Sequence, residues 1–180
     1  MEQRLLSYFF DKDVKIGDEK RRDRSETRIA KKRDKEKVFA GRVIVLVDSD
    51  SASAAEVFAR IMQLEKRAVV IGDQTAGMVM TSNHVTFAFS TVVQYVRPSS
   101  FYGANITVSD LIMSDGKSLE KVGVTPDLVL LPSAADLAAK RDPVLAKAAS
   151  MAGVELDAEK AGAIFPREAK EDDAKADDNK

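Results

Sequence analysis

The sequence predicts an α/β protein, and three consecutive stretches support this prediction. Val43–Val47 (VIVLV) is an apolar, mostly β-branched run, typical of a parallel strand buried on both faces. Residues 53–65 then place apolar side chains near helical spacing, and Ala68–Ile71 (AVVI) is a second apolar run closed by Gly72. This order of strand, helix and strand predicts a βαβ unit with a right-handed crossover.

The segment before this unit is rich in charge. Apolar side chains in residues 1–10 indicate a short helix, and Val14 and Ile16 alternate with charged residues as in a strand. Residues 18–37 hold ten Lys or Arg and six Asp or Glu, with almost no apolar side chain. This composition favours a solvated loop or exposed ribbon over a basic binding patch.

The segment after the unit mixes strand and helix patterns. The elements expected there are two strands within residues 79–97 joined in a hairpin around Ser90, a strand at Asn105–Met113, a turn at Ser114–Lys117, a short apolar run at Leu128–Leu131, and helices at Ser133–Lys140 and Pro143–Ala152. From Asp157 onward the chain is charged and rich in Ala, Lys and Asp, so we expect disorder there.

The composition restricts the possible functions. The 180 residues suffice for one domain with a core, and the net charge of −1 gives no global field for nucleic acid or an anionic membrane. Without cysteine there is no disulfide, thiolate metal site or cysteine nucleophile, and His84 is the single histidine. No apolar run reaches the roughly 18 residues of a membrane span, and the N-terminus lacks the pattern of a signal peptide. We expect neither a cofactor nor a metal.

Three serines lie where the first strand ends and the helix begins, in DSDSASAAEVFAR (residues 48–60). Ser53 and Glu56 fit the S-x-x-E capping box, in which the serine caps the helix and the glutamate reaches back. The same position suits acyl transfer, because a serine there lies at the carboxyl edge of the sheet beside the free N–H groups of a helix N-terminus. The local sequence leaves both interpretations open.

Five motifs in order resemble the catalytic domain of the S41 peptidases, the carboxy-terminal processing (tail-specific) proteases and their tricorn-like relatives. They are Val43–Asp48 (VIVLVD), Ser51–Glu56 (SASAAE), Arg67–Gly72 (RAVVIG), Thr75–Gly77 (TAG) and Val122–Asp127 (VGVTPD). The resemblance implies a ClpP/crotonase-like fold of stacked βαβ units, with a mainly parallel core sheet and an added β-hairpin. It divides the chain into a partial N-terminal segment with a charged loop (1–41), a peptidase core (42–153) and a charged, disordered tail (154–180).

For the site, the resemblance implies peptide-bond hydrolysis through an acyl-enzyme on Ser53. The backbone N–H of Ala54 would donate to the oxyanion, Ser51 would support the turn, and Glu56 would keep its capping role. The implied substrates are peptides or C-terminal segments of unfolded proteins. Neither nucleic acid nor a membrane span is implied, and an oligomer is compatible with the family. Its members are often exported, although this chain shows no signal peptide.

The sequence departs from the family at the general base. The family's base is a lysine directly after T-x-G, whereas Met78 follows Gly77 here. Three accounts remain: a tricorn-like histidine in a part that precedes this chain, His84 as the base, or loss of peptidase activity. Lys66 is near in sequence but has the pattern of an exposed helix end. The family's glycine-containing oxyanion segment and its PDZ domain are also missing, so we expect a truncated chain.

Three functions follow from these observations. The first is a serine endopeptidase domain of the S41 type. The second is a catalytically inactive pseudo-peptidase that binds peptides. The third is a crotonase-type enzyme acting on acyl-CoA thioesters, which would use backbone oxyanion donors without a serine nucleophile. Because the family's base and one oxyanion donor are missing, we expect this chain alone to show little or no peptidase activity.

Overall fold

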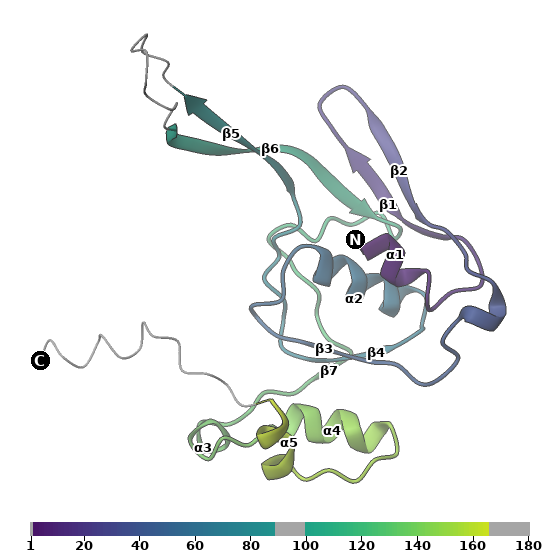
Figure 1. Cartoon of the computed structure of the whole chain (residues 1–180), viewed down its shortest axis with the longest axis vertical. Helices are drawn as coiled ribbons and strands as arrows, with labels where there is room; N and C mark the ends of the chain where they lie inside the picture. Colours follow the sequence, from purple (N-terminus) through teal and green to yellow (C-terminus); the bar gives the residue numbers. More distant parts are fainter. Residues whose placement is uncertain (1, 89–99, 166–180) are drawn as a thin grey trace, which may run out of the picture.

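The computed structural model describes residues 2–88 and 100–165, which form helices and two β-sheets (Figure 1). The helices are α1 (Glu2–Leu6), the 3-10 helix η1 (Lys35–Lys37), α2 (Ala54–Leu64), α3 (Ala134–Ala138), α4 (Pro143–Met151) and α5 (Ala158–Ile164). The strands are β1 (Val14–Lys20), β2 (Ser25–Ala30), β3 (Ile44–Val47), β4 (Val69–Gly72), β5 (Thr81–Ala88), β6 (Ser100–Met113) and β7 (Leu128–Val129). None of these helices is long and apolar enough to cross a membrane.

The smaller sheet contains the predicted βαβ unit. Strands β3 and β4 pair in parallel with α2 between them in sequence, and β7 adds in parallel to give the order β3-β4-β7. In the central strand, Val70 and Ile71 are fully buried, whereas Leu46 of β3 is 41% exposed. The predicted burial of Val43–Val47 on both faces is therefore wrong. Within the described residues β3 is an edge strand, and an apolar run alone does not distinguish an edge strand from a central one.

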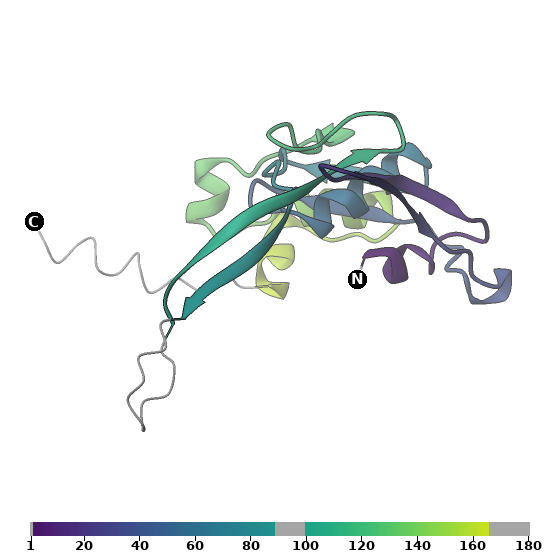
Figure 2. The ribbon, with the colours of Figure 1, turned by 90° about the horizontal axis from the view of Figure 1, so that it is seen from above.

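The larger sheet is antiparallel, with the strand order β2-β1-β6-β5. Strands β1 and β2 form the exposed ribbon predicted from the charges, and β5 pairs with β6 in a long hairpin that extends from the rest of the molecule (Figures 1 and 2). The expected turn at Ser90 lies outside the described residues. A mainly parallel core sheet with an added β-hairpin was expected. The β3-β4-β7 sheet is parallel, but the larger sheet is antiparallel throughout, because β6 also pairs with β1, about 90 residues away in sequence. Alternating patterns cannot reveal such distant partners.

One apolar core joins the two sheets. Helix α2 buries Val57, Ile61 and Met62, and the same cluster contains Leu6 of α1 and Ile16 of β1. Figure 1 shows α1 beside α2. Ala30 of β2 belongs to the cluster too, so the charged N-terminal segment contributes α1, β1 and β2 to the core of the βαβ unit.

The C-terminal helices include one that the sequence did not predict. Helix α5 begins at an Asp157 cap, whose Oδ1 accepts from the Lys160 N–H at 2.8 Å, and it buries Ala161. The Ala158 carbonyl accepts from the Asp142 N–H at 2.8 Å, directly before α4. The expectation of disorder from Asp157 onward is therefore wrong for α5. Short helices gain most of their stability from packing, which composition does not show.

Candidate active site

Ser53 lies at the turn between β3 and α2, at the carboxyl edge of the parallel sheet. It is the N-cap of α2, is exposed, and has φ 57° and ψ −118°. A residue other than glycine in such a conformation stores about 1–3 kcal/mol of strain and persists only where its surroundings hold it. The Ser53 N–H donates to the Met78 carbonyl at 3.0 Å and to Glu56 Oε2 at 2.9 Å. The predicted position of Ser53 is confirmed, while its role as a nucleophile stays a prediction.

The turn that precedes Ser53 is closed by Ser51. The Ser51 hydroxyl donates to Asp48 Oδ1 at 2.8 Å and accepts from the Asp48 N–H at 3.1 Å. The Ser51 carbonyl accepts from the Ala76 N–H at 3.0 Å, which joins this turn to the loop after β4. The next residue after Ser53, Ala54, opens α2, and N–H groups in the first turn of a helix have no acceptor within the helix. Ser51 therefore closes the turn, while the role of the Ala54 N–H as an oxyanion donor stays a prediction.

Glu56 is a fully buried carboxylate that connects the turn to the T-x-G loop. Besides the Ser53 N–H, it accepts from the Thr75 hydroxyl at 2.6 Å, the Gly77 N–H at 2.8 Å and the Met78 N–H at 2.9 Å. Hydrogen bonds to an ionised carboxylate are about twice as strong as neutral ones. The capping role is as predicted, whereas the three bonds to residues 75–78 were missed because nothing in S-x-x-E indicates so distant a loop.

The T-x-G loop is held against the segment before β7. The Thr75 hydroxyl accepts from the Val124 N–H at 2.7 Å while it donates to Glu56. Gly77 has φ 69°, and a Cβ there would lie 2.9 Å from the Val122 nitrogen. A Cβ at Gly123, which has φ 70°, would lie 2.4 Å from the Thr75 carbonyl oxygen. Glycine is required at both positions, so two of the sequence motifs meet here as one packed unit.

Met78 lies directly beside Ser53, joined by the backbone hydrogen bond described above, and its side chain is 64% exposed. The next two residues are held by Glu120, whose Oε2 accepts from the N–H groups of Val79 at 3.0 Å and Met80 at 3.1 Å. A thioether cannot take a proton from a hydroxyl group. Met78, which stands where the resemblance implies a base, is therefore next to the serine in the backbone but lacks the required chemistry.

His84 lies on β5, where its Nδ1 is 2.8 Å from Asn105 Oδ1 on β6. Its ring lies over Gly103, because a Cβ on that glycine would come within 2.7 Å of His84 Cε1 and Nε2. Among the described residues, no hydrogen bond joins His84 to Ser53. The observed contacts are those of a cross-strand pair on the extended hairpin.

Two lysines remain as possible bases. Lys66 follows the end of α2, an 11-residue helix about 16 Å long, so it lies at the opposite end from Ser53. Lys121 was not singled out from the sequence, yet its N–H donates to the Gly77 carbonyl at 2.7 Å. The backbone of Lys121 therefore contacts Gly77, the residue before Met78. Among the described residues, no cluster of acidic, histidine or cysteine side chains could hold a metal ion.

The fold and this site define an α/β protein with an exposed serine between a parallel strand and the helix that follows it. A sequence model of peptidase family S41 matches residues 3–130. A carboxy-terminal-processing protease from Bartonella bacilliformis is 33% identical over 89 residues, which are 49% of this chain and 18% of that protein.

Two solved structures resemble the chain in fold. A candidate peptidase from Parabacteroides merdae has a TM-score of 0.66 at 18% identity, over 84% of this chain and 46% of that one. The photosystem II D1 C-terminal processing protease has a TM-score of 0.57 at 22% identity, over 73% of this chain and 31% of that one. The chain thus spans less than half the length of each of these three relatives.

Because the family match covers more than half of the chain, this protein belongs to peptidase family S41. The resemblance found in the sequence motifs is thereby confirmed.

Proposed function

We propose that the chain is a serine-type endopeptidase domain whose nucleophile is Ser53. The observation that carries the proposal is the strained, exposed conformation of Ser53 at the start of α2, held by Glu56 and the Met78 carbonyl. A serine so placed has its hydroxyl at the surface and the first N–H groups of the helix beside it. These are the two elements needed for attack on a carbonyl and for stabilisation of the resulting oxyanion.

The reaction would proceed by acyl transfer. The Ser53 Oγ attacks the scissile carbonyl carbon, its proton passes to a base, and the oxyanion accepts a hydrogen bond from the Ala54 N–H. The C–N bond then breaks, the proton passes to the leaving nitrogen, and the acyl group remains on Ser53 as an ester. Water hydrolyses this ester, releases the second product and restores the hydroxyl. Glu56 acts as a positioning residue, because it holds the backbone of Ser53 and not the reacting atoms.

The substrates would be peptides and the C-terminal segments of unfolded proteins. The name of the Bartonella relative, a carboxy-terminal-processing protease, supports this class. The β3–α2–β4 unit supports the proposed ClpP/crotonase-like stacking, of which it would be one repeat within a core at residues 42–153.

The presence or absence of a general base near Ser53 distinguishes this proposal from a second one. Met78 beside Ser53 favours a pseudo-peptidase that binds peptides without cleaving them. In the first proposal the base is His84, Lys121 or a group outside this chain. Since the hydroxyl needs a base within about 2.6–3.2 Å, we expect slow turnover by this chain alone.

The test combines a fluorophosphonate probe with turnover of an unstructured peptide. Met78→Lys restores an amine at the family's base position, and Met80→Lys, two residues along, is the matched control. We expect weak wild-type turnover, a modest rise in Met78→Lys, no rise in Met80→Lys, and probe labelling at Ser53. Ser53→Ala should abolish both turnover and labelling.

Other outcomes would identify the alternatives. If Ser53 resists the probe and Met78→Lys adds no turnover, the chain is a pseudo-peptidase. Turnover that survives Ser53→Ala would exclude Ser53 as the nucleophile. Robust wild-type turnover would reveal a base in the chain, and loss of it in His84→Ala or in Lys121→Ala would identify that base.

A further inference from the structure

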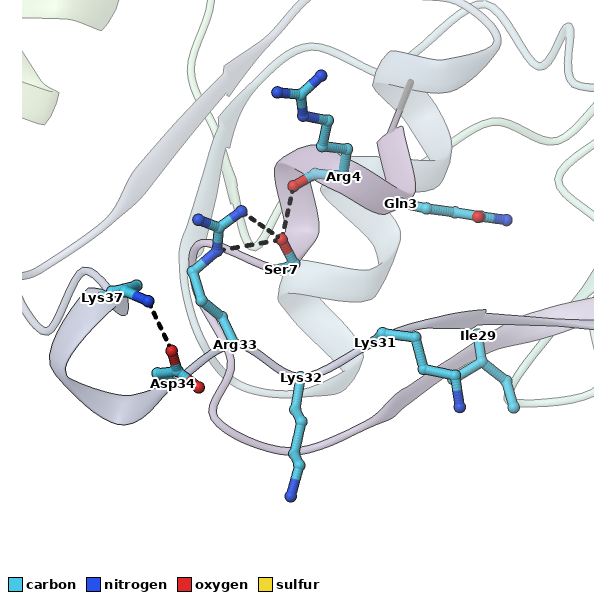
Figure 3. Close-up of a pocket in the computed structure, with 9 residues that line it drawn as sticks. All are labelled: Gln3, Arg4, Ser7, Ile29, Lys31, Lys32, Arg33, Asp34 and Lys37. Atoms are coloured by element: carbon cyan, nitrogen blue, oxygen red, sulfur yellow. Dashed lines mark hydrogen bonds and ion pairs between the residues drawn. The ribbon is translucent and has the colours of Figure 1, made fainter.

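A hollow lies on the molecule between α1, the end of β2 and the connection from β2 to η1 (Figure 3). It has a volume of about 530 Å³, and five of its nine lining residues are Lys or Arg. These five residues are Arg4, Lys31, Lys32, Arg33 and Lys37, and the hollow that they line is called the basic pocket below. None of the motifs of the proposed active site contributes to it.

One cation of the basic pocket is held in a defined position. The Arg33 guanidinium lies 3.5 Å from the centre of the Tyr8 ring, and its Nη2 donates to the Ser7 hydroxyl at 3.2 Å. Figure 3 shows Ser7 between Arg33 and Arg4. A guanidinium fixed in this way binds a carboxylate with less loss of conformational entropy than a mobile ammonium does.

The pocket keeps a surplus of positive charge. Asp34 lies 2.7 Å from Lys37, and Asp13 lies 2.8 Å from Lys31. Five cations less these two carboxylates leave a net charge of +3. Such exposed pairs stabilise a protein by at most about 1 kcal/mol, so both lysines can turn to a ligand. Within the described part of the chain, the side chains of Arg4 and Lys32 form no ion pair.

We propose that the basic pocket binds an acidic peptide segment, in which two or more Asp or Glu side chains meet Arg4, Lys32 and Arg33. The inference deepens the proposed function and rests on it, since the ligand would be part of a substrate chain. Arginine matches carboxylate geometry with paired hydrogen bonds. Nucleic acid is disfavoured because the Arg33 guanidinium covers the Tyr8 ring, an aromatic face on which a base could otherwise stack.

The experiment measures fluorescence anisotropy of a labelled peptide with four consecutive acidic residues, using the Ser53→Ala protein so that no cleavage occurs. A peptide with Gln and Asn in their place is the neutral control. We expect binding of the acidic peptide only, weakened by 0.5 M NaCl. The double variant Arg4→Glu/Lys32→Glu should bind at least about tenfold more weakly.

A matched double variant separates the pocket from the overall charge. Lys117→Glu/Lys147→Glu changes two exposed lysines outside the pocket and lowers the net charge by the same four units. It should bind like the parent. Equal loss in both doubles, equal binding of the neutral peptide, or displacement of the acidic peptide by inorganic phosphate or single-stranded RNA at constant ionic strength would overturn the proposal. Probe labelling of Ser53 is independent of all these outcomes, so failure here does not imply failure of the proposed function.

Discussion

At the scale of single residues, Ser53 and Glu56 show how one short motif serves two purposes. The Glu56 carboxylate accepts from the Ser53 N–H as S-x-x-E predicts, but the same carboxylate also accepts hydrogen bonds from three groups of the loop at residues 75–78. The cap and the loop then hold Ser53 in a conformation that the serine alone would avoid. The structural and the catalytic interpretations of this motif are therefore compatible.

Gly72 is packed too closely against β3 to tolerate a side chain. It has φ 131°, and a Cβ there would lie 1.8 Å from the Val47 carbonyl oxygen, which accepts from the Asp73 N–H. Gly116 also has a positive φ but faces open space. Gly116→Ala should cost only backbone strain, about 1–3 kcal/mol. Gly72→Ala should lower the free energy of unfolding clearly more, because β3 must move away from β4 to make room for the added Cβ. Urea unfolding compares the two variants, and equal midpoints would contradict the argument.

At the scale of elements, the hairpins and the C-terminal helices depend on their neighbours more than on their own sequence. Helix α5 has only seven residues, too few to be stable alone, and it is supported by its cap and by α4. The β5–β6 hairpin places His84 against Asn105 and Gly103, so the contacts of this histidine come from the partner strand β6.

The cap of α5 predicts a local dependence on pH. The hydrogen bond from the Lys160 N–H, followed by the bond from the Lys160 side chain, holds the pKa of Asp157 below its ordinary value. A carboxyl group with a lowered pKa stabilises the folded state above its ordinary pKa of about 3.8. That stability is lost as the pH falls through the lowered value. Protection of the Ala161 amide, measured as its exchange rate relative to the intrinsic rate at the same pH, should therefore fall on acidification in the wild type.

Asp157→Asn is the control for this prediction. Asparagine caps helices about as well as aspartate but does not titrate, so protection of the Ala161 amide should lose this dependence on pH. The same acid midpoint in the wild type and in Asp157→Asn would show that another group controls α5.

At the scale of the whole molecule, hydrogen bonds to Glu56 and Thr75 join three parts of the chain. They connect α2, the loop after β4 and the segment before β7. Ser53 therefore depends on groups from all three, and the site is a property of the assembled core rather than of one turn.

A double-mutant cycle tests this connection. Thr75→Val leaves the buried Val124 N–H without its acceptor, and Glu56→Gln weakens the same network of hydrogen bonds. Each substitution should therefore lower the free energy of unfolding by about 1–3 kcal/mol or more. Because the two side chains touch, their effects should differ from additivity by about 0.5–3 kcal/mol in urea unfolding. Thr75→Val combined with Glu155→Gln, an exposed change, should be additive. Additivity in the first pair would refute the coupling.

The sequence by itself determined the βαβ unit, the start of α2 at Ser53, the capping box and the family motifs, because spacing and caps act within a few residues. Tertiary structure alone decided the edge position of β3, the antiparallel sheet, helix α5 and the bonds from Glu56 to Thr75 and Gly77. It also placed Met78 beside Ser53 and His84 beside Asn105. Each of these depends on pairing or packing between segments far apart in the chain, and the pattern within one segment carries no record of its partner.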